Sequence, residues 1–359
     1  MDDISQGIDS VSISDGGIAA AVACDMSTSK KEDMNSEKKC TSCKQNLDNV
    51  KTNEVEIDAS ANDMIESICV NCGKEGAKNT CNKCKQVKYC NAACKKRHRH
   101  KHKKDCEEHL KRVAELHDEK LFKQPQPKED CPICFLCLPT YHKGWKYMAC
   151  CGKIICSGCI HAPVYDDQGN KVDNQKCPFC RTPYRKTEEK ERELKRVEAN
   201  DPLAINTLGC DYRDGTKRHR DYTKALELFH RAGELGYTEA YTSIGSLYFN
   251  GKGVKVDEKK ALHYFERAAI AGDVYARYNL GISEEDTGNF DRAVKHLMIA
   301  VRSGDNCSLE EIKRIYSDGH ATKDDYTKSL RLYQEYLGEV KSRQRDEAAA
   351  FDQDYKYID

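Results

Sequence analysis

The spacing of cysteine limits what this chain can fold into more than any other feature. Of its 21 cysteines, 19 lie before residue 181, and most of these form C-x-x-C pairs. Such pairs are typical of zinc sites, in which two pairs together hold one ion in a tetrahedron. A segment too small for an apolar core folds in this way because metal binding supplies the free energy. The sequence therefore predicts a zinc-rich front half and a back half built on other principles.

The composition agrees with zinc sites rather than disulfides. No apolar run approaches the roughly 20 residues that a membrane span needs, and Met1-Asp2-Asp3 has the wrong charge for a signal peptide. We therefore expect an intracellular protein, cytoplasmic or nuclear, without membrane partners, in which thiols stay reduced. The 59 Lys and Arg residues balance 59 Asp and Glu residues, so no global field attracts nucleic acid or anionic lipid.

Composition divides the chain into segments. Residues 1–60 are polar and poor in aromatics, so we expect disorder; the pair Cys40 and Cys43 lies there without a second pair nearby, and we interpret it as incidental. The remaining segments are a first cysteine cluster (69–106), a short connecting helix (107–123), a Pro-bearing linker (124–130), a second cluster (131–184), a charged connector (187–200), repeats (201–340) and a C-terminal tail (341–359).

The first cluster offers eight zinc ligands, enough for two ions at four ligands each. The candidates are Cys69, Cys72, Cys81, Cys84, Cys90, Cys94, His102 and Cys106. Their order and spacing, with Tyr89 before the fifth ligand, resemble the MYND-type zinc finger. The resemblance implies interleaving, with Cys69, Cys72, Cys90 and Cys94 on one ion and Cys81, Cys84, His102 and Cys106 on the other.

Ten consecutive basic residues, 95–104, lie inside this cluster. Because the run carries His102 and ends near Cys106, we interpret it as the outer face of a zinc-finger helix, with His98 and His100 as surface or packing residues. Because the whole chain has no net charge, this run is the segment to which nucleic acid would have to bind. It contains no aromatic residues, so the sequence argues against a nucleic-acid partner. MYND fingers that bind proline-rich peptides usually have Gln and Trp where this chain has Lys95 and Arg99, which favours a more acidic partner.

The second cluster resembles a RING finger. It opens with Cys131-Pro-Ile-Cys134 and closes with Cys177-Pro-Phe-Cys180-Arg181, with Cys156 and Cys159 between. The resemblance implies that Cys131, Cys134, Cys156 and Cys159 bind one zinc ion. For the other ion, Cys177 and Cys180 pair with Cys150 and Cys151, as in the all-cysteine RING variant, or with one of these and His142 or His161. Cys137 is not needed to complete either set of four ligands, and we interpret it as a buried thiol.

A RING finger implies ubiquitin transfer without a covalent enzyme intermediate. Its partners would be ubiquitin and a ubiquitin-conjugating enzyme, which the domain orients toward a substrate lysine. On this resemblance Ile133 and Pro178 form an apolar shelf for the conjugating enzyme, and Arg181 holds the position that bridges it to ubiquitin. The alternative is that none of the three contacts a partner: Ile133 would be a core residue, Pro178 would form a turn, and Arg181 would be a surface charge.

The back half repeats. Gly209, Gly245 and Gly281 are 36 residues apart, as are Lys224-Ala225 and Lys260-Ala261. A period of this length predicts a solenoid of helix pairs, in which small residues let helices approach closely and glycines end them. The phrase "GKGVKVDEKKALHYFERAAIAG" (251–272) resembles the Sel-1-like repeat, a relative of the tetratricopeptide repeat. About four units follow one another, the last of them degenerate.

The sequence therefore predicts a multi-domain protein with two small zinc-stabilised domains, MYND-like and then RING-like, followed by an all-α helix-turn-helix solenoid. Four Zn²⁺ ions are expected, two per zinc-finger domain. The predicted function is that of a RING-class ubiquitin ligase, with a protein substrate or adaptor held by the repeats. The alternative is a non-enzymatic zinc-binding adaptor for protein–protein interaction.

Overall fold

The computed structural model describes residues 68–125, 129–162, 164–165, 168, 171–172 and 176–358. The expected disordered segment 1–60 and the Cys40–Cys43 pair lie outside these residues. The chain divides into two compact units, whose described parts are residues 68–121 and residues 122–358. We describe each unit by itself.

The smaller unit joins a short hairpin to one long helix. Strand β1 (Asn79–Thr80) pairs antiparallel with β2 (Lys88–Tyr89), and helix α2 spans Ala92–Leu121. The sequence suggested a separate connecting helix after the zinc finger, but the two segments form one 30-residue helix. Residues 107–121 contain neither Gly nor Pro, so nothing interrupts the hydrogen-bond ladder.

The larger unit contains the second cysteine module, residues 129–184. It contains the 3₁₀ turn η2 (His142–Gly144), strands β3 (Trp145–Met148) and β4 (Lys153–Cys156), helix α3 (Ser157–His161), and strands β5 (Val164–Tyr165) and β6 (Lys171–Val172). Strands β3 and β4 pair antiparallel, as do β5 and β6. Leu138, Met148 and Ile155 supply its buried apolar side chains, beside four buried cysteines.

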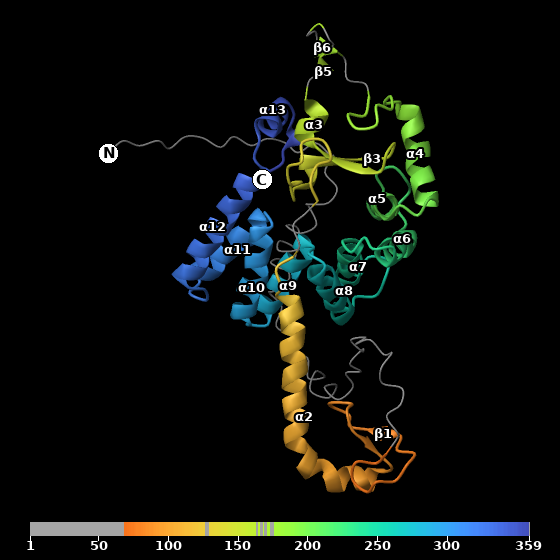
Figure 1. Ribbon diagram of the computed structural model, residues 1–359, viewed down its shortest axis with the longest axis vertical. Coiled ribbons are helices and arrows are strands. Elements are labelled where there is room, and N and C mark those ends of the chain that lie inside the picture. The colour runs from red at the N-terminus through yellow and green to blue at the C-terminus, as the bar shows by residue number, and fades with distance from the viewer. Residues whose placement is uncertain are drawn as a thin grey trace, which may run out of the picture. The chain divides into compact units, whose positions relative to one another are not determined.

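Antiparallel helix pairs follow, as the repeat predicts (Figure 1). Helix α4 (Lys186–Glu198) leads into the pairs α5 (Pro202–Asp214) and α6 (Tyr222–Glu234), α7 (Ala240–Asn250) and α8 (Glu258–Ile270), α9 (Val274–Asp286) and α10 (Phe290–Arg302), and α11 (Asn306–Ser317) and α12 (Lys323–Val340). Aspartates cap five of these helices by accepting backbone N–H bonds: Asp201, Asp221, Asp257, Asp273 and Asp305.

The repeated glycines explain how each pair packs. A Cβ atom on Gly209 would lie 2.7 Å from the Phe229 ring, and one on Gly245 would lie 2.6 Å from the Phe265 ring. Both rings are fully buried, at 0% and 1% exposure. In these two pairs the glycine of the first helix forms the socket for an aromatic ring of the second, and any side chain would displace that ring. In the next pair, a Cβ atom on Gly281 would lie 2.8 Å from the Leu297 side chain.

The C-terminal segment is folded, although the sequence suggested a tail. Helix α13 (Arg343–Phe351) and the turn η3 (Gln353–Tyr355) pack on the second cysteine module. His161 of α3 contacts the rings of Phe351 and Tyr355 at 4.6 and 5.8 Å. The module is thus covered by residues from the far end of the chain.

The second cysteine module is bonded to both ends of the solenoid. At the N-terminal end, Tyr147 donates to Asp201 (2.7 Å) and Arg196 Nε donates to the carbonyl of Ala149 (3.1 Å). At the C-terminal end, the Thr140 N–H donates to the Tyr336 hydroxyl (2.9 Å). A cavity of about 400 Å³ lies between the module and the solenoid. It is lined by η2 and β3 on one side and by α5, α7 and α9 on the other.

Candidate metal centres

Four groups of Cys and His side chains could each hold a metal ion. Within each group the ligand atoms lie within 4.8 Å of one another. The groups are Cys69, Cys72, Cys90 and Cys94; Cys81, Cys84, His102 and Cys106; Cys131, Cys134, Cys156 and Cys159; and Cys150, Cys151, Cys177 and Cys180. All sixteen predicted ligand residues are present in these groups.

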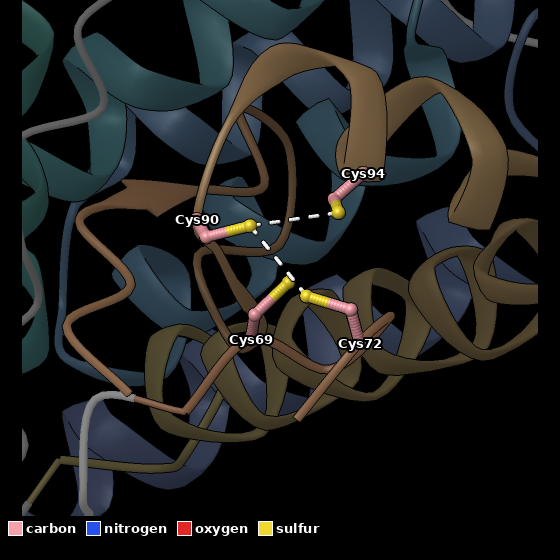
Figure 2. Close-up of side chains that lie close together, drawn as sticks. All are labelled: Cys69, Cys72, Cys90 and Cys94. Carbon is pink, nitrogen blue, oxygen red and sulfur yellow. Dashed lines mark hydrogen bonds between the residues drawn. The ribbon is translucent and has the colours of Figure 1, made fainter. Parts of the chain in front are cut away.

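The pairs interleave in both modules. In each module, the eight ligand residues form four successive pairs along the chain. The first and third pairs form one group, and the second and fourth pairs form the other. Figure 2 shows the first group, where the Cys90 Sγ lies 3.6 Å from the Cys72 Sγ and 3.5 Å from the Cys94 Sγ. Cys69 and Cys72 come from a turn before β1, whereas Cys94 is on α2. One ion here would connect the hairpin region to the helix.

Four tight turns present the C-x-x-C pairs in the same way. After each pair, the next residue donates its N–H to the carbonyl of the first cysteine, over 2.8–3.1 Å, and has a φ of 56–72°. These residues are Gly73, Lys85, Phe135 and Arg181. A left-handed conformation costs a non-glycine residue about 1 kcal/mol or more, so at three positions the surrounding site must hold the turn in place.

The thiols in each group cannot all ionise together without a cation. In the first group, burial alone would raise the pKa of Cys69, but backbone N–H groups of Cys90, Asn71 and Cys72 lower it to about 6. The neighbouring Cys90 bonds to Cys94 and is partly desolvated, which raises its pKa to about 12. Thiolates this close repel one another, and a divalent ion removes the conflict.

The histidine of the first module has the contacts of a ligand. His102 is buried on α2, with Nε2 3.2 Å from the Cys84 Sγ. His98, one turn earlier, stacks on the His102 ring and lies 3.3 Å from the Tyr89 hydroxyl. His98 is therefore a packing residue beside the ligand ring, while His100 is exposed.

Adjacent cysteines share a site in the second module because the chain turns sharply there. The N–H groups of Cys151 and Gly152 both donate to the Met148 carbonyl, at 3.1 and 2.8 Å. Gly152 has a φ of +70°, which glycine adopts without strain. Cys150 and Cys151 thereby both reach the last C-x-x-C pair.

The alternative histidines lie elsewhere. His142 lines the cavity beside the solenoid, and His161 packs on the C-terminal segment; neither belongs to one of the four groups. Cys137 also lies outside the groups, half-buried, with Sγ 3.7 Å from the Leu138 carbonyl oxygen.

The donor sets fit zinc. Thiolate and imidazole ligands in groups of four are the usual shell of structural zinc, which leaves no open position for water. These groups would therefore stabilise folds rather than activate a nucleophile. Zinc is the cofactor that this chemistry selects.

Arg345 is a residue near the metal groups that sequence reasoning missed. This α13 side chain is fully buried, and it donates to the carbonyls of Val340 (2.7 Å) and Leu136 (3.4 Å). Its Nε meets no oxygen or nitrogen acceptor among the described residues. Burial would lower the pKa of this arginine, but the neighbouring Cys156 and Cys134 thiols raise it. No local pattern could have indicated it, because 209 residues separate Arg345 from Leu136.

The residues predicted to contact a conjugating enzyme lie on two of the tight turns. Ile133 and Pro178 are half-buried, and Arg181 is exposed. Two aromatic side chains that the sequence did not single out lie beside them: Phe135 is 76% exposed and Phe179 is 44% exposed. Exposed aromatics on a small rigid module are typical of contact surfaces.

Two family models match the chain. The MYND finger matches residues 69–106, and the Sel1 repeat matches residues 202–237 and 238–273. The helix pairs α9–α10 and α11–α12 continue the repeat beyond the matched region.

Several proteins share part of the chain. A Sel1-like repeat-containing protein of Acanthamoeba polyphaga mimivirus is 26% identical over 35% of this chain and 23% of its own length. The E3 ubiquitin-protein ligase DA2 of Arabidopsis thaliana is 36% identical over 34% of this chain and 32% of its own. DAP3-binding cell death enhancer 1 of Rattus norvegicus is 31% identical over 29% and 21%. The chain therefore spans less than a third of the length of these relatives.

Among solved structures, a Sel1 repeat protein from Oxalobacter formigenes is similar, at 28% identity over 44% of this chain and 66% of its own length, with a TM-score of 0.39.

Within the described residues, no helix combines the length and apolarity that crossing a membrane requires. The chain thus carries a MYND finger, which binds zinc, and an all-α Sel1 repeat solenoid, a type of module that mediates protein–protein interaction.

Proposed function

We propose that this protein is a RING-class ubiquitin ligase. The observation that carries the proposal is the interleaved pair of four-cysteine groups in residues 131–180, with Ile133, Pro178 and Arg181 on their turns. The similarity of part of the chain to the E3 ubiquitin-protein ligase DA2 supports the same class. In this proposal the sixteen grouped residues are the zinc ligands, and each module binds two ions.

The docking surface for the conjugating enzyme would comprise Ile133 and Pro178 with the exposed rings of Phe135 and Phe179. Zinc fixes both turns, so this surface is rigid before the partner arrives, which lowers the entropy lost on binding. An apolar patch with aromatic anchors suits a transient protein contact.

Arg181 would then orient the ubiquitin thioester. Its left-handed backbone conformation (φ 61°) and the hydrogen bond from its N–H to the Cys177 carbonyl (2.9 Å) fix where the side chain leaves the turn. A guanidinium offers five donors in one plane and can bond two proteins at once. Its contribution is orientation rather than covalent chemistry.

The solenoid would hold the substrate or an adaptor. The face formed by α5, α7 and α9 is partly covered by the cysteine module, and the remaining cavity of about 400 Å³ has room for side chains but not for a folded domain. We therefore expect a folded partner to contact the outer or lateral surfaces of the repeats, with at most a short segment in the cavity.

An in vitro ubiquitination assay tests the proposal. The zinc-loaded chain is incubated with ubiquitin, activating enzyme, ATP and a panel of conjugating enzymes, and polyubiquitin is measured. Ile133→Ala and Arg181→Ala should each lower the rate at least tenfold with unchanged zinc content. Lys146→Ala, at an exposed position of β3 away from the turns, is the matched control and should behave as wild type.

A zinc-binding adaptor is the second candidate, favoured by the fact that both matched family models describe interaction modules. If the protein with four bound zinc ions forms no chains with any conjugating enzyme, the ligase is excluded and the adaptor remains. If chains form but Arg181→Ala is fully active, the ligase stands and the role of Arg181 is lost.

A further inference from the structure

A basic groove lies in the first cysteine module, and none of the residues used in the proposed ligase lines it. Its volume is about 500 Å³, and one wall is the first half of α2 while the other includes Asn82 and Lys83. Five basic side chains line it: Lys83, Lys95, Lys96, Arg99 and Lys103. Glu107 is the only acidic side chain among the lining residues.

The charge of the groove persists when zinc is bound. A Zn²⁺ ion with three thiolates and one imidazole carries a net charge of −1, and this group forms part of the groove floor through Cys81, His102 and Cys106. The five cations exceed this charge and that of Glu107 by three. The basic side chains are therefore too numerous to serve only as counter-charges for the metal site.

One end of the groove is held in a fixed geometry. The Lys95 ammonium donates to the Thr80 carbonyl at 2.9 Å and to the Asn82 side-chain oxygen at 2.6 Å. These bonds connect α2 to the opposite wall and hold the charge of Lys95 at the groove. Lys103, by contrast, is 72% exposed and lies 4.0 Å from Glu107.

Three of the cations form a regular row. Lys95, Arg99 and Lys103 are four residues apart on α2, so their positions advance by about 6 Å each along the helix. In an extended peptide, alternate side chains point the same way at intervals of about 6.6 Å. Carboxylates at every second residue of such a peptide would therefore meet the three cations in register.

We propose that this groove binds an acidic segment of a partner protein, in an extended conformation, with Asp or Glu at three alternate positions. The row of cations ends at Glu107, so a basic residue should follow at the next alternate position. Each contact is a charge-assisted hydrogen bond or ion pair on a surface that metal binding has already ordered.

A protein segment suits the groove better than single-stranded nucleic acid. Binding of bases needs exposed aromatic faces on which they stack. The aromatic residue among the groove residues is Tyr89, and it is 1% exposed. The groove thus presents charge without a stacking surface.

Fluorescence anisotropy with the zinc-loaded full chain tests the proposal. The probe is a labelled peptide containing Glu-Thr-Glu-Thr-Glu-Thr-Lys, and its isomer containing Glu-Glu-Glu-Thr-Thr-Thr-Lys has the same charge. We expect the alternating peptide to bind at least fivefold more tightly. Arg99→Glu should weaken its binding about tenfold, and raising the salt concentration should weaken it further.

Arg97→Glu is the matched control, because it makes the same charge change at an exposed α2 position outside the groove. It should alter binding by less than twofold, with zinc content unchanged in both variants. Equal binding of the two peptides, or equal loss in the two variants, would overturn the proposal in favour of general electrostatic attraction. Tighter binding of a labelled ten-residue oligothymidine would overturn it in favour of nucleic acid. The ubiquitination assay is independent of all these outcomes.

Discussion

The first cysteine module and the solenoid have cores of opposite kinds. Among the described residues, five of the seven buried core residues of the module are cysteines. The apolar cluster formed by the second half of the solenoid and Tyr357 has eleven buried residues, and none of them is a cysteine. The module therefore depends on metal–ligand bonds, whereas the solenoid depends on buried apolar area.

The second cysteine module is intermediate between these two. It adds Leu138, Met148 and Ile155 to its buried cysteines, and it is hydrogen-bonded to Asp201 at the start of α5, to α12 and to α13. We therefore expect the second module to depend less on its metal than the first, because other elements cover it.

Removal of zinc should produce the largest difference between the regions. A strong chelator should unfold residues 69–106 completely, because structural zinc contributes on the order of 10 kcal/mol to such a fold. Helices α5 to α10 should stay folded, since their core contains no metal group. Hydrogen exchange followed by mass spectrometry measures both, and the comparison fails if the solenoid loses protection to the same degree as the finger.

Replacement of Arg345 should weaken zinc binding in the second module. Arg345→Met removes a buried cation that interacts electrostatically with Cys134 and Cys156, and loss of contacts around metal ligands typically lowers metal affinity 10- to 100-fold. The rate of zinc transfer to a coloured chelator should rise for one ion per chain. Arg343→Met is the matched control, because that side chain is 92% exposed; equal rates in the two variants would contradict the role of Arg345.

Glycine substitution in the solenoid should have the smallest effect. Gly245→Ala places a Cβ atom 2.6 Å from the Phe265 ring, and overpacking of this kind costs about 1–3 kcal/mol, partly offset by about 1 kcal/mol of helix propensity. Gly338→Ala in α12 meets no atom within 4 Å and should stabilise the chain slightly. Denaturant unfolding of the α5–α12 region measures the free energy of unfolding of the two variants. If Gly245→Ala raised this free energy, the Phe265 ring would be able to move aside.

The sequence predicted the features that depend on local spacing. The four cysteine turns and the 36-residue repeat are such features, because ligand geometry and helix pairing act over short stretches of chain. The structure gathers the predicted ligand residues into four groups and forms the predicted helix pairs.

Long-range packing could not be predicted in this way. Residues 341–359 have no periodic apolar pattern, yet Arg345 is fully buried against a module more than half the chain away. The fusion of the zinc-finger helix with the connecting helix is also absent from the prediction, because ligand spacing defines the last ligand, Cys106, but not the end of the helix that carries it. In the structure, one helix continues from Ala92 to Leu121.

The bonds between the second cysteine module and both ends of the solenoid have a mechanical consequence. Repeat arrays are usually elastic, because each unit contacts only its neighbours and small rotations add up along the array. Here Asp201 at the start and Tyr336 near the end are hydrogen-bonded to the same module. We therefore expect the array to resist gradual stretching, because widening its inner face would break one of these attachments.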